Sequence, residues 1–381
     1  MNSEQILERL VGFPTVSRDS NLALIEYVRD FLTSCGVGAR LYADESGRKA
    51  NLYAVVGPRD RGGVLLSGHT DVVPVDGQKW TSDPFRLVER GGRFYARGAA
   101  DMKGFIACAM RAVSLASARE LRIPLQLALS YDEEIGCVGV RSLIDDMATW
   151  AHRPQFCIVG EPTLLRPAIG HKGKTALAAV CRGHAAHSAA PGRGVNAIYM
   201  ASELIDKIRA RQSAIEASGA RDPGYEVPYT TLHVGVVHGG TVLNIVPSRC
   251  DLEFEIRNLP EDDATKIVAG MRADAAAITS SVSRDDVDVG IDVEVTNEYP
   301  PLDTPADSAV VALAAALTGQ QDRIKVGFGS EGGLFSERLG IPTVVCGPGS
   351  IDQAHKPDEF IDRDQVHRCD AMMDALLDRL V

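Results

Sequence analysis

The chain of 381 residues lacks several features that mark whole classes of protein. Its apolar runs all stop short of the ~20 residues that a membrane-spanning helix needs, so we predict no helical membrane anchor. The first turn of the chain is acidic, and residues 1–17 have neither the basic nor the apolar region of a signal peptide. We therefore expect a cytoplasmic protein.

Paired cysteines are also missing. None of the eight cysteines belongs to a C-x-x-C pair, which argues against a thiolate zinc knuckle. Most of them lie among apolar neighbours, as Cys108 and Cys346 do, and a thiol in such surroundings behaves as a small hydrophobic side chain. We therefore predict reduced, buried cysteines.

Basic residues are too few for a general nucleic-acid binder, since 40 Lys and Arg face 51 Asp and Glu and leave a net charge of −11. The sequence also lacks G-x-x-x-x-G-K-[ST], a G-x-G-x-x-G that follows a strand, and the G-x-S-x-G turn of serine hydrolases. These absences argue against a nucleotide-binding loop and against a serine nucleophile held in that turn.

The sequence does contain an alternation of strands and helices. Residues 104–116 have the pattern of a helix, and four short β-rich runs surround it, at 51–57, 64–68, 125–131 and 156–160. The alternation returns near the C-terminus. It predicts an α/β domain with a central, mostly parallel sheet over residues 1–172 and 298–381.

Residues 173–297 follow a different pattern. They read as a strand, a helix at 196–210, two strands of period 2, a helix at 263–277 and a last strand. This order predicts an α+β module, ferredoxin-like in its sequence of elements, inserted into the larger domain. Two domains also suit the length, which exceeds what one core usually organises.

Acidic and imidazole side chains follow the predicted strands at their carboxyl ends, where open α/β sheets bind ligands. Each one alone has an ordinary explanation, such as a surface pair, a helix N-cap or a solvated loop. Together, two imidazoles and three carboxylates suit two zinc-class ions with one shared carboxylate. The five candidate ligands are His69, Asp101, Glu134, Glu161 and His355.

Seven stretches in this order resemble the family of zinc aminoacylases, which remove acyl groups from amino acids. They are SGHTDVVP, RGAADMKG, DEEIG, GEPT, HSAAPGRGVNAI, NIVPSRCDLEFEIR and GPGSIDQAHKPDEF, and they span nearly the whole chain. The resemblance implies that His69 and Glu161 hold one metal ion and that Glu134 and His355 hold the other. It implies that Asp101, on a cis peptide bond, bridges both ions.

The resemblance also implies roles for residues outside the ligand set. Asp71 would orient His69, and Glu133 would act as general base and acid. The inserted module would be a dimerisation lid, in which His187 reaches the active site of the partner subunit and stabilises the oxyanion. Asn244 and Arg257 match positions of the lid that contact the substrate.

Within this family, the resemblance favours N-acetyl-L-ornithine as substrate. Ser330 and Glu331 lie in a loop at 327–335 that resembles a substrate loop, where Glu331 would meet the amine of the substrate's side chain. A solvated loop carboxylate is an equally good explanation of Glu331. This segment departs from common family forms, which puts the substrate in doubt.

Three questions stay open at the level of sequence. The substrate is alternatively N-succinyl-diaminopimelate, a dipeptide or a wider range of N-acyl amino acids. A second alternative is a dimer that binds metal and ligand but has lost catalysis; the presence of Glu133 beside a full ligand set argues against it. The mixed nitrogen and oxygen ligands suit zinc, with cobalt or manganese also possible.

Overall fold

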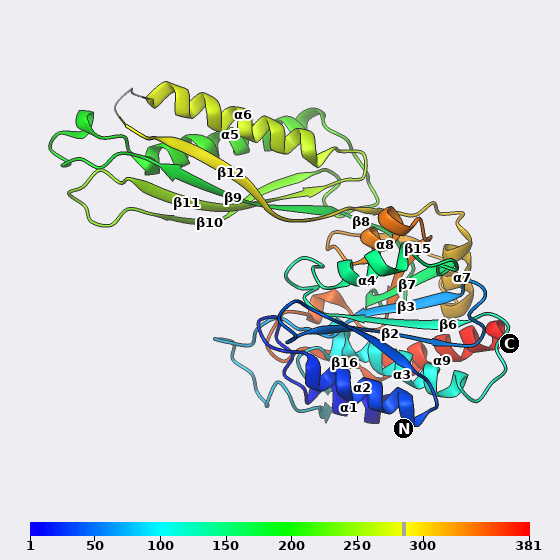
Figure 1. The fold of residues 1–381 in the computed structure, drawn as a ribbon. Coiled ribbons are helices and arrows are strands. Elements are labelled where there is room, and N and C mark those ends of the chain that lie inside the picture. Colours follow the sequence, from blue (N-terminus) through cyan, green and yellow to red (C-terminus); the bar gives the residue numbers. More distant parts are fainter. Residues whose placement is uncertain (284–286) are drawn as a thin grey trace. The chain divides into compact units, whose positions relative to one another are not determined.

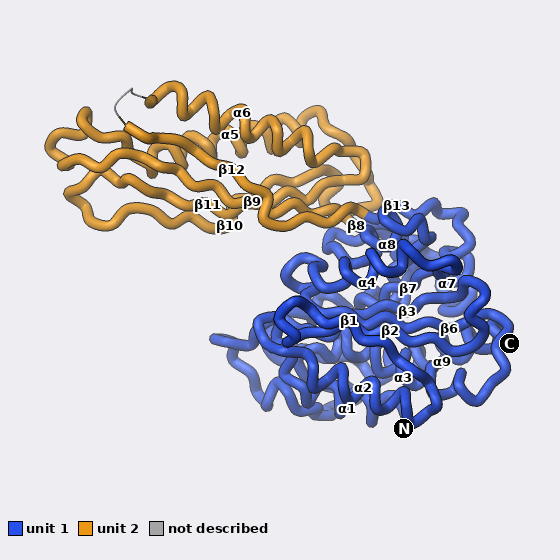
Figure 2. The backbone as a smooth tube through the Cα atoms, in the orientation of Figure 1, with its two compact units in different colours: residues 1–171, 302–381 blue, residues 172–301 orange. Residues whose placement is uncertain are grey.

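The computed structural model divides the chain into two compact units (Figures 1 and 2). Unit 1 comprises residues 1–171 and 302–381, and unit 2 comprises residues 172–301. The structure describes residues 1–283 and 287–381. The candidate metal ligands all belong to unit 1.

Unit 1 contains a nine-stranded mixed sheet with the order β1-β2-β6-β3-β7-β15-β8-β13, and β14 lies beside β8. The ladders that join β6, β3, β7 and β15 are parallel, whereas β1, β2 and β13 pair antiparallel. The predicted parallel arrangement therefore holds for the centre of the sheet only. The strands are β1 (Ala39–Ala43), β2 (Ala50–Val56), β3 (Val64–His69), β6 (Leu125–Ser130), β7 (Phe156–Pro162), β8 (Ala168–His171), β13 (Leu302–Asp303), β14 (Ile324–Val326) and β15 (Thr343–Gly347).

Every residue of β3, β6 and β15 is buried, which explains why these strands read as continuous apolar runs. One large core joins the sheet to α1 (Ser3–Val11), α2 (Leu22–Ser34), α3 (Gly104–Ala116), α7 (Ala309–Thr318) and α9 (Arg363–Leu380). The other face carries α4 (Val140–Met147) and α8 (Gly332–Leu339), as Figure 1 shows. Helix α3 has the bounds that the sequence predicted.

A small three-stranded sheet of order β16-β5-β4 lies next to the segment that carries Asp101. Its strands are β4 (Val88–Arg90), β5 (Arg93–Tyr95) and β16 (Phe360–Asp362). The turn at 99–103 precedes α3, and its Asp101–Met102 peptide bond is cis, as the family resemblance implied.

Unit 2 has the element order strand, helix, strand, strand, helix, strand and an antiparallel sheet of order β10-β11-β9-β12. This is the ferredoxin-like arrangement. Apolar residues of both helices share one core with the sheet. The elements are β9 (Gly173–Arg182), α5 (Ala197–Ser218), β10 (Thr231–Gly239), β11 (Arg249–Asn258), α6 (Ala264–Val282) and β12 (Gly290–Tyr299), with a 3-10 turn at Pro191–Arg193.

The two helices of unit 2 run further than the sequence predicted. We expected them to end at residues 210 and 277, but α5 continues to Ser218 and α6 to Val282. Ile215 and Val282, in these added turns, pack against the core of unit 2. Tertiary contacts therefore extend helices whose amphipathic pattern weakens along the chain.

All eight cysteines are free, and all except the partly buried Cys35 are buried. The prediction of reduced, buried cysteines is therefore confirmed for seven of them. Every helix within residues 1–283 and 287–381 is too short or too polar to span a lipid bilayer.

Candidate metal centre

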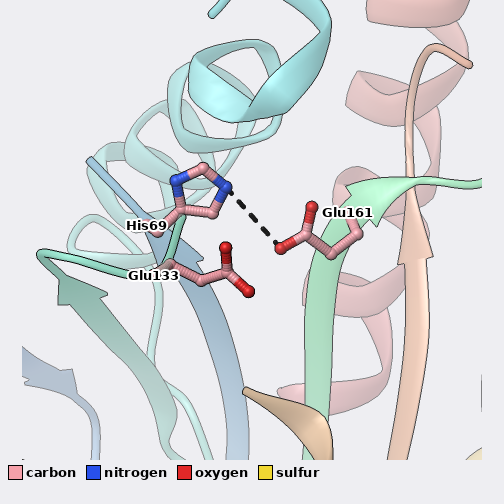
Figure 3. A group of neighbouring side chains, drawn as sticks. All are labelled: His69, Glu133 and Glu161. Carbon is pink, nitrogen blue, oxygen red and sulfur yellow. Dashed lines mark ion pairs between the residues drawn. The ribbon is translucent and has the colours of Figure 1, made fainter. Parts of the chain in front are cut away.

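Acidic and imidazole side chains gather where the carboxyl ends of β3, β6 and β7 meet at one edge of the sheet. His69 is the last residue of β3, Glu161 lies near the end of β7, and Glu133 follows β6 by a short turn. Figure 3 shows these three side chains close to one another, with His69 Nε2 3.7 Å from Glu161 Oε1. One ligand atom from each lies within 4.8 Å of the other two, which is close enough for a shared cation.

Asp101 lies between the two imidazoles of the site. Its Oδ1 is 3.1 Å from His69 Nε2, and its Oδ2 is 3.2 Å from His355 Nε2. The same nitrogen of His355 is 3.1 Å from Glu134 Oε2. The structure therefore brings all five predicted ligand side chains and Glu133 into one cluster, although they come from five separate segments of the chain.

The crowding of these groups changes their pKa values. Burial raises the pKa of Glu161 well above its ordinary value, and the Asp101 carboxylate adds to the rise. Burial lowers the pKa of His69, but Glu161 and Asp101 outweigh it and hold that pKa well above its ordinary value. Hydrogen bonds with Asp101 and Glu134 raise the pKa of His355 to about 10. Carboxylates that stabilise protonated imidazoles in this way would also stabilise a metal cation among them.

Asp71 holds the segment that carries the neighbouring carboxylates. Its carboxylate accepts hydrogen bonds from the backbone N–H groups of Glu133 and Glu134, at 3.1 and 3.3 Å, and from Ser17 Oγ at 2.7 Å. His69 Nδ1 lies 2.9 Å from the backbone oxygen of Asp71 and 3.6 Å from its carboxylate. This contact leaves His69 Nε2 directed at Asp101, the geometry expected when one ring nitrogen is held and the other binds metal.

Glu133 differs from the other carboxylates of the cluster in its partners. Its Oε1 accepts a hydrogen bond from Cys137 Sγ at 3.3 Å. Burial raises the pKa of Glu133 to about 8, and the charges of Glu134 and Glu331 add to the rise. A carboxyl group whose pKa lies near neutrality can both accept and return a proton, as acid–base catalysis requires.

A second observation, independent of residue type, indicates that the cluster fits a metal ion. Glu161 Oε1 is buried and has no hydrogen-bond partner among the described residues, since His69 Nε2, at 3.7 Å, lies beyond hydrogen-bond distance. A buried carboxylate oxygen is rarely left unpaired, because its desolvation costs free energy that only a donor or a cation can offset. Mixed imidazole and carboxylate ligands of this kind suit a divalent transition metal.

Ser330 and Glu331 are buried, which contradicts the explanation of Glu331 as a solvated loop carboxylate. The side chain of Glu331 accepts a hydrogen bond from Ser67 Oγ at 3.1 Å, and its Oε1 has no partner among the described residues. Ser330 Oγ accepts a hydrogen bond from the N–H of Gly332 at 3.1 Å. The expected loop at 327–335 also ends early, because α8 begins at Gly332.

The lid residues of the prediction belong to unit 2. His187 and Asn244 come from neighbouring segments, since His187 is bridged to Ile245 and the N–H of Ser188 donates to the backbone oxygen of Asn244 at 3.0 Å. Arg257, on β11, donates to Glu255 and to the hydroxyl of Tyr299, both at 2.9 Å. The roles predicted for His187, Asn244 and Arg257 remain proposals.

Sequence reasoning missed several residues that hold the site. Ser17 contacts Asp71, and Arg97 and Glu359 form a buried ion pair beside the turn of Asp101. Arg97 and Glu359 stand inside the stretches RGAADMKG and HKPDEF, so their proximity to candidate ligands in the sequence was the available signal. Ser17 had no such signal, because its contact depends on how the chain folds.

A family model gives the site its context. The model of peptidase family M20/M25/M40 matches residues 65–379, which is most of the chain. The chain belongs to this family. It is therefore a metal-dependent hydrolase, and membership argues against a dimer that has lost catalysis. The M20/M25/M40 match covers every candidate ligand from His69 to His355.

Individual relatives of this M20/M25/M40 chain agree. It is 34% identical over 372 residues to an acetylornithine deacetylase of Myxococcus xanthus, covering 96% of this chain and 94% of that protein. Its fold is similar to an M20 family metallo-carboxypeptidase from Sulfolobus solfataricus, with a TM-score of 0.78, 21% identity and coverage of 99% and 98%. It is also similar to the Bacillus subtilis protein YXEP, described as a dinuclear metal-binding peptidase, with a TM-score of 0.67, 15% identity and coverage of 99% and 97%.

Proposed function

We propose that this chain hydrolyses the amide of an N-acyl amino acid, and that its substrate is N-acetyl-L-ornithine, which yields L-ornithine and acetate. Such a reaction would supply ornithine to arginine biosynthesis in the cytoplasm. The observation that carries the proposal is the cluster of two imidazoles and three ligand carboxylates with a further carboxylate, Glu133, beside them. The relative from Myxococcus xanthus, an acetylornithine deacetylase, supports the choice of substrate.

The proposed cofactor is a pair of divalent metal ions, zinc in the first place, with cobalt or manganese as alternatives. His69 and Glu161 would hold one ion, Glu134 and His355 the other, and Asp101 both. The Asp101 contacts support this division, since one of its oxygens lies beside His69 and the other beside His355. When bound, the ions would supply Lewis acidity to the amide carbonyl and to the attacking water.

The protein's own residues would move the proton. Glu133 accepts a proton from the attacking water at a carboxylate oxygen and returns it to the departing amine nitrogen. Asp71 holds Glu133 in place through the hydrogen bond from its backbone N–H, and Cys137 Sγ donates to one oxygen of the carboxylate. His187 of the partner subunit would donate to the oxyanion that forms on the carbonyl oxygen.

Glu331 is the residue that we propose for recognition of the ornithine side chain. It is a buried carboxylate whose Oε1 has no hydrogen-bond partner among the described residues, so an ammonium group could pair with it. Ser330 is proposed to line the same subsite. In unit 2, Arg257 suits the α-carboxylate of the substrate, and Asn244 would donate to it or to the acyl group.

The deciding experiment compares kcat/KM for N-acetylornithine, N-acetylnorvaline, N-succinyl-diaminopimelate and dipeptides in protein loaded with zinc, cobalt or manganese. N-acetylnorvaline has the same carbon chain without the terminal amine, so it tests the pairing with Glu331. We expect N-acetylornithine to be preferred, and chelation to abolish turnover until metal is restored. A preference for dipeptides would overturn the substrate and favour a peptidase, as the carboxypeptidase from Sulfolobus solfataricus is described.

A further inference from the structure

A buried ion pair lies beside the candidate metal centre, although neither of its residues is a candidate ligand. Arg97 Nη1 is 2.6 Å from Glu359 Oε2, and both side chains are 1% exposed. Because removing two charges from water is unfavourable, such a pair adds little to stability by itself. The other hydrogen bonds of Arg97 and Glu359 indicate which segments of the chain the pair holds in place.

Glu359 holds the backbone of the turn that carries Asp101. Its Oε1 accepts hydrogen bonds from the N–H of Ala100 at 2.9 Å and from the N–H of Asp101 at 3.1 Å. One carboxylate oxygen therefore fixes two successive peptide groups. Because the second belongs to Asp101 itself, Glu359 determines the point from which the Asp101 side chain extends.

Arg97 holds the loop that carries His355, through one intermediate residue. Arg97 Nη2 donates to Gln78 Oε1 at 2.7 Å, and Gln78 Nε2 donates to the backbone oxygen of His355 at 3.1 Å. Arg97 Nη1 also contacts the backbone oxygen of Lys356, at 3.4 Å. These contacts reach the peptide groups on the C-terminal side of His355.

The loop of His355 needs such support. The side chain of His355 is 50% exposed, so packing alone does not hold it. Its φ is 62°, in the left-handed region that is unfavourable for a residue with a Cβ. Asp358, also left-handed at φ 56°, accepts hydrogen bonds from the N–H and Oγ1 of Thr81, at 2.9 and 3.0 Å. Two separate contacts therefore join the segment 78–81 to this loop.

We propose that Arg97 and Glu359 are positioning residues that together set the separation of Asp101 from His355, with Gln78 as the link to the histidine. The inference rests on the proposed two-ion centre, in which Asp101 and His355 bind the same ion. Asp101 Oδ2 and His355 Nε2 are 3.2 Å apart, and neither residue lies in a strand. The pairing of β5 with β16 joins the two segments several residues away from these ligands, and the ion pair adds contacts at the turn of Asp101 and at the loop of His355.

The test is metal binding by Gln78→Leu and Glu359→Gln. Gln78 is partly exposed, so Gln78→Leu keeps the fold. It removes the link to His355 together with the hydrogen bonds that Gln78 Oε1 accepts from Arg97 and from Trp80 Nε1. In Glu359→Gln the amide oxygen can serve the two N–H groups or Arg97, but not both. We expect each variant to lose about 10–100-fold in affinity for the ion held by Glu134 and His355, as the loss of an outer partner of a ligand typically does. The ion held by His69 and Glu161 should stay tightly bound in Gln78→Leu, whereas Glu359→Gln should weaken it too, because Asp101 would hold both ions.

Competition with a chelator and metal analysis of the protein measure this loss without reference to activity. At saturating metal, kcat should return toward the wild-type value with KM unchanged, because the variants alter the site and not the substrate contacts. The matched control is Asp362→Asn, which removes an exposed ion pair with Arg93, 3.0 Å long, from the adjoining strands β5 and β16. Its metal affinity should equal that of the wild type.

Three results would overturn the inference, and measurements of metal content, metal affinity and melting temperature distinguish them. If wild-type protein binds two ions and both variants bind them equally tightly, the ion pair has no positioning role, while the proposed function stands. If wild-type protein binds no pair of ions, the metal centre fails and this inference fails with it. A lower melting temperature of metal-free Glu359→Gln, with unchanged metal affinity, would reduce the pair to a purely structural role.

Discussion

Glu133 has a different proposed role from the carboxylates around it. The other five residues complete the proposed two-ion site without it. We expect Glu133→Gln to bind metal as the wild type does and to lose about 10²–10⁴-fold in kcat, since proton transfer in the transition state is what the carboxylate supplies. Steady-state kinetics with N-acetylornithine, together with metal analysis, measures both properties. Turnover at the wild-type rate would remove Glu133 from the role of general base.

The buried carboxyl group of Glu331 makes the stability of the protein depend on pH. Burial raises the pKa of Glu331 to about 7, although the charge of His69 and the hydrogen bond from Ser67 lower it. The ordinary pKa of a glutamate carboxyl is 4.5. The higher pKa in the folded state means that Glu331 binds more protons in the folded state than in the unfolded state. Stability of the metal-free protein therefore falls as pH rises from about 4.5 to about 7, by up to about 3 kcal/mol from this group.

The variant Glu331→Gln should remove this penalty. Its melting temperature relative to metal-free wild type should be more favourable at pH 8 than at pH 5, as measured by thermal unfolding. Glu337→Gln, at an exposed position on α8, the helix that follows Glu331, is the control and should show no such difference. An equal effect of Glu331→Gln at both pH values would mean that Glu331 carries no charge at pH 8.

Strand β7 and helix α3 illustrate the scale of the secondary-structure element. A Cβ at Gly160 would lie 2.0 Å from atoms of the Phe105 ring, so the strand approaches the helix as closely as only glycine permits. Gly160 directly precedes Glu161. The close packing of strand on helix therefore also sets the depth of a candidate metal ligand.

Gly160→Ala should destabilise the protein by about 1–3 kcal/mol or more, since overpacking forces the ring or the strand to shift. It should also weaken metal binding, because Glu161 moves with the strand. Thermal unfolding with and without metal measures both effects. Gly38→Ala is the matched control, as a Cβ there meets no atom within 4 Å. If Gly160→Ala behaves like the control, β7 does not fix the position of Glu161.

At the scale of the whole molecule, unit 2 carries a group of exposed apolar residues. Val242, Leu243 and Ile245 are 54%, 101% and 42% exposed, and their segment runs beside His187. Exposed apolar groups that cluster in this way mark interaction surfaces. They support the proposal of a homodimer formed through unit 2, with His187 acting in the active site of the partner subunit.

Mixed dimers test this proposal. Glu133→Gln and His187→Ala should each be inactive alone, but a dimer of one of each contains one site with both residues intact. Co-expression with two affinity tags and double purification should therefore recover about half of the wild-type activity per dimer, because a two-fold dimer has two equivalent sites. A tagged dimer of two His187→Ala subunits is the control. An inactive mixed dimer would place His187 in its own subunit's site, whereas wild-type activity of His187→Ala alone would place it outside catalysis.

Much of the architecture was predictable because it is local. The β-rich runs at 64–68, 125–131 and 156–160 predicted the central strands β3, β6 and β7, and helix α3 has the predicted bounds. The residue types that would bind metal were also readable, since imidazoles and carboxylates stood at the carboxyl ends of those runs. Periodicity and residue type are properties of short segments, so they can be recognised without knowledge of the fold.

What the sequence by itself determined, then, was which elements form and which side chains could bind a cation. Only the tertiary structure decided that His355 meets Asp101, that Glu331 is buried and that Glu359 holds the turn beside it. These contacts join segments more than 200 residues apart, as Ala100 and Glu359 are. No local pattern encodes them, because they arise from the packing of the sheet, its helices and its loops into one core.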